Sequence, residues 1–195
     1  MSGHRANQLI LLVGYRGTGK SAAGRALAAR LGWGFADADE HVEAAAGTSI
    51  ADVFAAEGEP GFRDRESAAL AELCRLDRHV VSTGGGVILR PANRDRLKSA
   101  GFVAWLTARP ETIHARLRAD PTTAARRPKL TALGDVEEVR QLLAAREPLY
   151  RETAAFQIAT DDLSPEAVAD AILSAWNGGS TCRSPSGPCS PSSSG

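Results

Sequence analysis

One stretch of the chain, LLVGYRGTGKSAAGRAL at 11–27, restricts the possible folds more than any other part of the sequence. Residues 9–13 form an unbroken apolar run, which is typical of a strand buried inside a parallel sheet. Residues 21–31 carry apolar side chains at helical spacing. Between them, GYRGTGKS at 14–21 matches every fixed position of the pattern G-x-x-x-x-G-K-[ST]. The sequence therefore predicts a strand, a tight glycine-rich loop and a helix in succession.

The residue types of this loop suit the binding of a nucleotide's phosphates. The backbone of Gly17, Thr18 and Gly19 can turn tightly and point successive N–H groups at a phosphate, and the following helix adds its positive N-terminal end. Lys20 would reach the β- and γ-phosphates, and the Ser21 hydroxyl would hold Mg²⁺. An ordinary glycine-rich turn is the alternative, but the flanking strand and helix favour phosphate binding.

The rest of the chain alternates between strand and helix signals, which predicts an α/β fold with a parallel sheet. We expect strands at 9–13, 34–36, 79–82, 102–106 and 155–159. We expect helices near 21–31, 39–46, 49–57, 60–76, 91–100, 110–117, 135–146 and 165–176. One domain would then span 1–177, and the Gly/Ser/Pro-rich segment 178–195 would be a disordered tail.

Composition narrows the range of partners. The formal net charge is zero, so no bulk field favours nucleic acid or an anionic membrane. No apolar run approaches the length of a membrane span, and residues 1–8 lack the apolar segment of a signal peptide. We therefore expect a cytoplasmic monomer that acts on a small molecule and has neither nucleic acid nor a membrane as partner.

A basic, proline-containing segment, RADPTTAARRPKLTALGD, interrupts the helical pattern at 118–135. In a phosphate-binding α/β protein such a segment is a candidate mobile lid, here about 118–131. Its closure would exclude water and bring charge onto a transferring phosphoryl group. A solvated surface loop is the alternative interpretation.

Two carboxylates, Asp37 and Asp39, follow the second expected strand. Ligands of open α/β sheets bind at this carboxyl edge, and residues two apart on a strand point the same way. Asp37 could then serve Mg²⁺ through its waters, while Asp39 meets a hydroxyl of the acceptor. The alternative is that Asp39 caps a helix and Asp37 is solvated.

Two arginines stand out in the rest of the chain as candidate functional residues. Arg63 lies in the charged stretch GEPGFRDRE, where its guanidinium could grip an anion or simply pair with Glu66 on one helix face. Arg146 stands at the expected end of a helix, and Pro148 and Tyr150 fix the chain beyond it. By itself this second signal is weak.

Three consecutive glycines follow the third expected strand: Gly84, Gly85 and Gly86. They cost backbone entropy, which is understandable where a ligand must lie against bare backbone at the carboxyl edge of the sheet. A plain flexible turn is the alternative.

Together these segments resemble the shikimate kinase family over about residues 8–176. The resemblance rests on GYRGTGKS, the D-x-D of FADAD, G-E-x-x-F-R-x-x-E in GEPGFRDRE, STGGG, RRPKL, and R-x-P-L-Y in REPLY. The phosphate loop identifies only a superfamily, whereas the other motifs at these intervals single out the family. The resemblance implies a three-layer P-loop fold with flanking helices and a five-stranded parallel sheet of order 2-3-1-4-5.

The same resemblance implies a reaction: the γ-phosphoryl group of ATP passes to the 3-hydroxyl of shikimate, on the route to chorismate and aromatic amino acids. Mg²⁺ is the implied cofactor and ATP the co-substrate. Lys20 and Ser21 would hold the phosphates and the metal, with Asp37 near the metal. Asp39 would contact the acceptor hydroxyls and accept the proton.

The remaining roles carried over from the family concern the anionic groups. Arg63 and Arg146 would grip the shikimate carboxylate above a backbone floor formed by Gly84–Gly86. Arg127 would lie over the phosphates from the lid, and Arg116 beside adenine.

Two other functions stay open at this point. Another small-molecule P-loop kinase, such as a gluconate-type enzyme, shares the phosphate loop, although an uncharged sugar acceptor would give no reason for both Arg63 and Arg146. A non-catalytic ATP-binding module would couple ATP to a partner protein and would not need Asp39.

Overall fold

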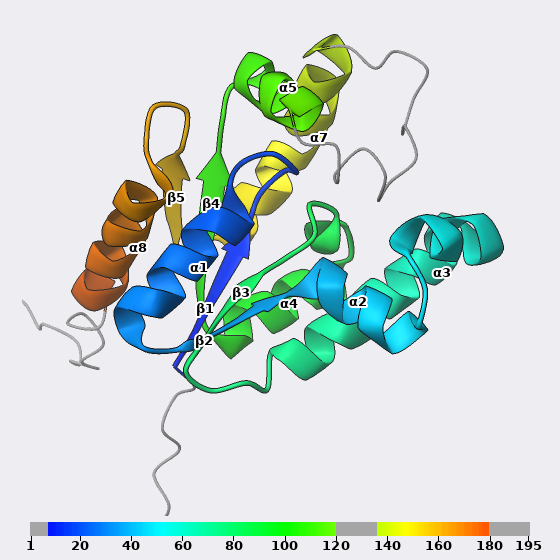
Figure 1. The fold of residues 1–195 in the computed structure, drawn as a ribbon, viewed down its shortest axis with the longest axis horizontal. Helices are drawn as coiled ribbons and strands as arrows, with labels where there is room; N and C mark the ends of the chain where they lie inside the picture. The colour runs from blue at the N-terminus through cyan, green and yellow to red at the C-terminus, as the bar shows by residue number, and fades with distance from the viewer. Residues whose placement is uncertain (1–7, 120–135, 180–195) are drawn as a thin grey trace, which may run out of the picture.

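Five parallel strands form one sheet in the order β2-β3-β1-β4-β5 (Figure 1). This computed structural model describes residues 8–119 and 136–179. The strands are β1 (Leu9–Val13), β2 (Gly34–Asp37), β3 (His79–Ser82), β4 (Phe102–Thr107) and β5 (Phe156–Ala159). β1 is central, because Leu11 pairs with Val81 of β3 on one side and with Val103 of β4 on the other. The predicted fold class and strand order are confirmed.

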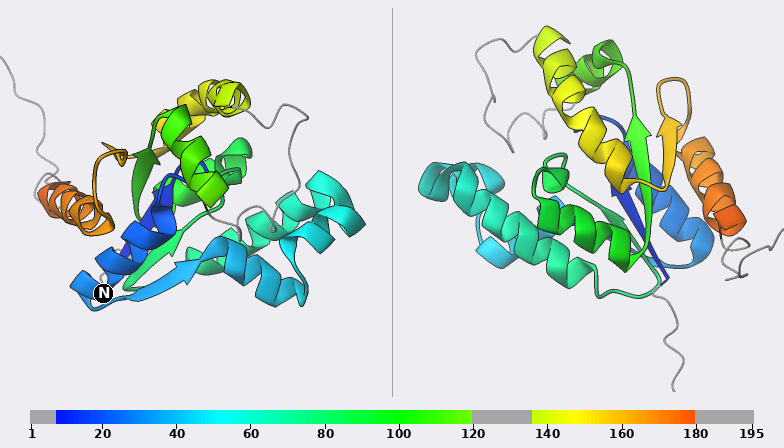
Figure 2. Two further views of the ribbon diagram at one scale, coloured as in Figure 1. Left: turned by 45° about the horizontal axis from the view of Figure 1, so that its top comes forward. Right: turned by 180° about the vertical axis from the view of Figure 1, so that it is seen from behind.

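Helices cover both faces of this sheet and complete three layers. Their bounds are α1 (Lys20–Leu31), α2 (Ala38–Ala46), α3 (Ile50–Leu73), α4 (Pro91–Ala100), α5 (Pro110–Ala119), α7 (Val136–Thr153) and α8 (Pro165–Gly179), with a short 3₁₀ turn η1 (Val87–Leu89). α1 and α8 pack on one face, and α3, α4 and α7 pack on the other (Figure 2).

The apolar run of β1 is explained by this layering. Alternate side chains of a strand point to opposite faces, so Leu11 packs with Leu70 and Leu97 of α3 and α4, while Leu12 packs with Leu27 of α1. All five residues of β1 are at most 1% exposed. A strand buried on both faces must be apolar throughout, and its carboxyl end is thereby fixed in the middle of the molecule.

The helix expected at 49–57 and the one expected at 60–76 form a single element, α3, which ends at Leu73. Gly58 interrupts it with φ 67° and ψ −174°, a conformation that glycine adopts without strain. Two helical segments therefore meet at this residue with no separate loop between them.

The expectation that the helix carrying Arg146 ends at that residue is wrong. α7 continues through Pro148 to Thr153, although a proline inside a helix removes one backbone hydrogen bond. Tertiary packing outweighs this local cost, because Tyr150 is buried and stacks on Trp105 with ring centroids 5.6 Å apart. Arg146 is thus held within a continuous helix rather than at a frayed end.

The start of the predicted lid and the end of the predicted domain both differ from the structure. Arg118 and Ala119, the first residues of the predicted lid, belong to α5, and α8 continues to Gly179, past the expected domain end at 177. The rest of the lid, including Arg127, and the tail beyond Gly179 lie outside the described residues. Within the described ranges, no helix is long and apolar enough to cross a bilayer.

Candidate active site

The glycine-rich loop joins the carboxyl end of β1 to the first residue of α1. Gly17 and Gly19 have φ of 78° and 87°, in the left-handed region that only glycine enters freely. The ammonium Nζ of Lys20 donates to the carbonyl oxygens of Gly14 at 2.8 Å and Tyr15 at 2.9 Å. The loop therefore curls around the lysine, and the positive end of the α1 dipole opens toward the same space.

Arg116 braces the outer side of this loop from α5. Its Nη1 donates to the Gly17 carbonyl at 3.3 Å, and its Nη2 donates to the Thr160 carbonyl at 2.7 Å. The Thr160 hydroxyl in turn donates to the Thr18 carbonyl at 2.9 Å. Arg116 thus lies at the loop's side nearest β5 and ties three segments together there.

The expectation that Asp37 and Asp39 share one strand face is wrong. Asp37 ends β2 and is the N-cap of α2, where its Oδ1 accepts from the Asp39 N–H at 3.0 Å. Asp39 therefore lies in the first turn of α2. An N-terminal Asp that accepts from a backbone N–H two residues later stabilises the start of a helix, and this local preference ends the strand early. Both carboxylates still lie at the carboxyl edge of the sheet.

Three side chains at this edge make a small oxygen-rich group next to the loop. The Ser21 hydroxyl donates to Asp37 Oδ2 at 2.7 Å and lies 3.2 Å from the Ser82 hydroxyl. Among the described residues, no cluster of three or more His, Cys, Asp or Glu side chains could hold a metal ion. Mg²⁺ is commonly held by one carboxylate with waters and phosphate oxygens, so this set fits that ion.

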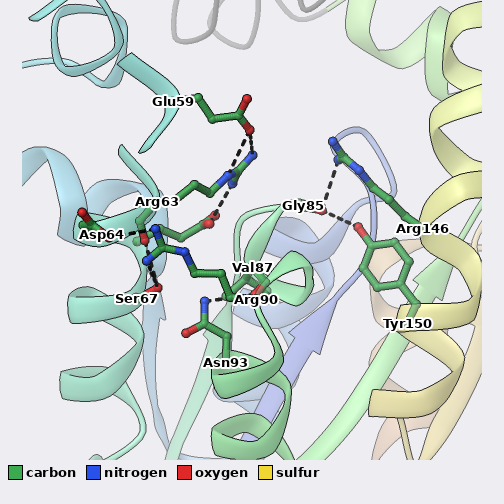
Figure 3. A network of polar contacts seen from close by, with 11 residues as sticks. Glu59, Arg63, Asp64, Ser67, Gly85, Val87, Arg90, Asn93, Arg146 and Tyr150 are labelled. Atoms are coloured by element: carbon green, nitrogen blue, oxygen red, sulfur yellow. Dashed lines mark hydrogen bonds and ion pairs between the residues drawn. The ribbon is translucent and has the colours of Figure 1, made fainter. Parts of the chain in front are cut away.

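The triple glycine packs directly against the glycine-rich loop. A Cβ at Gly85 would be 3.2 Å from the backbone nitrogen of Arg16 and 3.4 Å from the carbonyl oxygen of Gly14. The Gly85 carbonyl accepts from the Tyr150 hydroxyl at 2.6 Å and from Arg146 Nη1 at 3.3 Å (Figure 3). Arg146 is therefore positioned by the same backbone segment that lines the loop.

Aromatic packing adds to this positioning. The guanidinium of Arg146 lies over the ring of Tyr15, with Cζ 5.6 Å from the centroid, in the range of a cation–π contact. Burial raises the pKa of the Tyr150 hydroxyl well above its ordinary value, even though Arg146 opposes the shift. The hydroxyl therefore stays protonated and remains a donor to Gly85.

Arg63 approaches the triple glycine from the opposite side, on α3. Its Nη1 donates to Glu66 Oε2 at 2.7 Å, and a Cβ at Gly86 would stand 2.1 Å from that same nitrogen. Burial disfavours the charged form, but the carboxylates of Glu66 and Glu59 outweigh burial and raise the pKa of Arg63. The predicted pair with Glu66 is thus present, and the arginine also faces the glycine backbone.

The structure consequently gathers most of the predicted site residues at one edge of the sheet. Lys20, Ser21 and Asp37 lie around the loop, while Arg63 and Arg146 meet the triple glycine from two helices. Arg127 lies outside the described residues.

Three residues that lie within the quoted motifs make contacts in this site that the sequence did not predict. Glu59 holds the guanidinium of Arg63, Ser82 approaches Ser21, and the hydroxyl of Tyr150 anchors Gly85. Only Glu59 left a local signal, since it stands four residues before Arg63 on a helix. The other two contacts join segments far apart in the sequence.

A parallel sheet of this order, with a G-x-x-x-x-G-K-S loop after its central strand, places the chain among the P-loop nucleotide-binding proteins. A family model described as "Shikimate kinase" matches residues 16–177. The chain belongs to the shikimate kinase family, whose members are ATP-dependent kinases that transfer a phosphoryl group to a hydroxyl of shikimate.

Individual relatives agree with this assignment. The chain is 45% identical to a shikimate kinase of Rhodopirellula baltica over 86% of its own length and 90% of the relative's. It is 47% identical to one of Symbiobacterium thermophilum over 84% and 93% of the two chains. Among solved structures, the shikimate kinase from Acinetobacter baumannii in complex with shikimate superposes with a TM-score of 0.82. That chain is 36% identical, with 91% of this chain and 96% of the other covered.

Proposed function

We propose that this chain transfers the γ-phosphoryl group of ATP to the 3-hydroxyl of shikimate, with Mg²⁺ as cofactor. One observation carries the proposal: Arg63 and Arg146, from two different helices, both contact the triple glycine, which itself packs on the phosphate loop. This arrangement supports a small acceptor with a carboxylate at one end, next to a bound triphosphate.

The acceptor's carboxylate would be gripped by the two guanidinium groups. Charge-assisted hydrogen bonds from guanidinium to carboxylate are about twice as strong as neutral ones, and the planar fork also fixes direction. Because Gly84–Gly86 present no side chains, the ring could lie close to the backbone. Binding the far end of the acceptor in this way orients the opposite hydroxyls toward the loop.

At the nucleotide end, Lys20 would exchange its bonds to the Gly14 and Tyr15 carbonyls for contacts with phosphate oxygens. Ser21 and Asp37 would hold Mg²⁺, the serine through its hydroxyl and the aspartate through waters. The ion supplies positive charge that bridges the phosphate oxygens. Arg116 is proposed to lie beside adenine, since it braces the loop at its β5 side.

Asp39 is the proposed proton acceptor. A sugar-like hydroxyl has too high a pKa to be ionised beforehand, so a nearby carboxylate helps by orienting it and taking its proton late in the transfer. Its place in the first turn of α2, next to Asp37, supports this role. Arg127, in the proposed lid at about 118–131, would add positive charge over the phosphates.

The domain extent, oligomeric state, location and partners of the protein are also part of this proposal. We infer a single catalytic domain that extends beyond the expected 1–177 to the end of α8 at Gly179. We infer that it works as a cytoplasmic monomer on a small-molecule acceptor, with neither nucleic acid nor membrane as partner. The segment 178–195 has no assigned part in the reaction.

The test is a coupled assay of ADP release with ATP, Mg²⁺ and shikimate, run beside gluconate as the alternative acceptor. We expect turnover with shikimate only. Asp39→Asn should lower kcat by about 100-fold or more and leave the KM for ATP nearly unchanged, because general-base assistance contributes about 10²–10⁴ in rate. Full phosphoryl transfer by this variant would refute the role of Asp39, and equal turnover of gluconate would refute the acceptor.

A further inference from the structure

The guanidinium of Arg63 is already engaged by two carboxylates. Its Nε and Nη2 both donate to a single oxygen of Glu59, at 3.2 and 3.0 Å, and its Nη1 donates to Glu66 at 2.7 Å. An arginine fork has five N–H donors, and the Nε/Nη2 edge is one that a carboxylate can take side-on. That edge is the one that Glu59 covers.

The opposite side of the fork is closed by the protein. Glu66 has a side chain only 3% exposed and pairs with Nη1, and the Gly86 backbone crowds the same nitrogen. On the Nη1 side an incoming carboxylate would meet the buried Glu66 carboxylate, which repels it, and the Gly86 backbone. The accessible approach is the edge where Glu59 lies.

Glu59, by contrast, is free to leave. The side chain of Glu59 is 57% exposed, whereas that of Arg63 is 9% exposed. Glu59 also directly follows Gly58, where the helical conformation of α3 is interrupted. In Figure 3 its carboxylate lies above the guanidinium of Arg63, and Gly85 and Arg146 lie to the right of both. A partly exposed pair of this kind contributes only about 0.2–1 kcal/mol, so a ligand held by two arginines can displace it.

We infer that Glu59 is an affinity-setting residue that competes with the acceptor's carboxylate for Arg63. The inference rests on the proposed function: binding of the acceptor is an exchange of one carboxylate for another on the Nε/Nη2 edge, and Glu59 turns outward when the acceptor enters. Glu66 keeps its bond throughout and holds the guanidinium in place.

Charge accounting supports the exchange. With both glutamates in place, the group of Arg63, Glu59 and Glu66 carries a net charge of −1, which repels an anion. Once Glu59 has moved away, the arginine and Glu66 sum to zero, and Arg146 leaves the site positive. Glu59 also keeps the Arg63 guanidinium paired while the acceptor is absent. The expected consequence is a KM for shikimate higher than the two arginines alone would give.

The experiment compares Glu59→Gln with wild type in steady-state kinetics, varying shikimate at saturating ATP and ATP at saturating shikimate. We expect the KM for shikimate to fall by about 1.4- to fivefold, the range that corresponds to a partly exposed ion pair. The kcat and the KM for ATP should stay unchanged. Glu59→Ala should act in the same direction, which covers the case of a glutamine that still accepts from Arg63.

Glu57→Gln is the matched control. Glu57 lies on the same helix and pairs with Arg65, so the variant removes the same charge without touching Arg63. It should leave the KM for shikimate unaltered. In an Arg63→Ala background, Glu59→Gln should also lose its effect, because the competition requires the arginine.

The sign of the change decides the outcome. A KM for shikimate that rises in Glu59→Gln would identify Glu59 as a support for Arg63 and overturn the inference, as would an unchanged KM in both Glu59 variants. An equal fall of the KM for shikimate in Glu57→Gln would show that the loss of any nearby negative charge has this effect. That result would also overturn the inference. Wild-type turnover of shikimate in the same assay separates these results from a failure of the proposed function.

Discussion

Replacing Gly86 with alanine tests how tightly the site depends on the place of one guanidinium. Gly86 has φ −104° and ψ −2°, a conformation that alanine adopts without backbone strain. The added Cβ would stand 2.1 Å from Nη1 and 2.6 Å from Cζ of Arg63. The substitution therefore acts on the arginine rather than on the backbone.

The magnitude follows from these distances. Ordinary contact begins at about 3.4 Å, so the guanidinium must move outward by about 1.3 Å. Such a shift would disturb the 2.7 Å bond from Nη1 to Glu66 and misalign the fork toward the acceptor. Losing one charge-assisted hydrogen bond from this fork to the acceptor's carboxylate costs about 1.5–3 kcal/mol. The KM for shikimate should therefore rise about 10- to 100-fold.

The assay is the same coupled measurement, and the KM for ATP should stay within about twofold of wild type because Lys20 and Ser21 are untouched. Gly178→Ala is the control, since a Cβ there meets nothing within 4 Å. In an Arg63→Ala background, Gly86→Ala should have almost no further effect. A comparable rise in the KM for ATP, or the same penalty without Arg63, would refute the reasoning.

Two further predictions concern the second arginine and the partly buried thiol of Cys74. Arg146→Ala should raise the KM for shikimate at least about tenfold and leave the KM for ATP unchanged. Arg151→Ala, on the same helix but with a side chain 65% exposed, is the control and should change neither KM. An equal rise in both KM values in Arg146→Ala would contradict the role of Arg146 in holding the acceptor. Burial raises the pKa of the Cys74 thiol from 9.0 to about 11, so between these values only the unfolded chain releases the proton. The free energy of unfolding should therefore fall as pH rises through this window, and less so in Cys74→Ala; identical pH profiles from denaturant titrations would exclude the effect.

Much of this fold could be predicted because its signals are local. The apolar run at 9–13 must be a strand buried on both faces, and glycines at 17 and 19 allow the left-handed turns that the phosphate loop needs. All five expected strands are present within a residue or so of their predicted bounds. The loop motif likewise predicted a strand, a tight glycine-rich turn and a helix in succession, since its residues are consecutive.

The wrong predictions arose where one local preference competed with helix capping or with tertiary packing. Asp37 caps α2 through the Asp39 N–H, so the two carboxylates do not share a strand, and the alternation rule for strands did not apply. Pro148 would end most helices, yet α7 continues because Tyr150 is stacked on Trp105 and bonded to Gly85. Trp105 and Gly85 are both far from Tyr150 in the sequence, so no rule based on neighbouring residues could include their contacts.

The sequence by itself determined the order of elements, the phosphate loop and the residue types available for catalysis, because each follows from neighbours along the chain. Only the tertiary structure decided that Arg63 and Arg146 meet the same three glycines and that Glu59 covers the open edge of one of them. The physical reason is that this convergence depends on α3 and α7 packing on one face of the sheet. The burial that fixes such packing is a property of distant segments together.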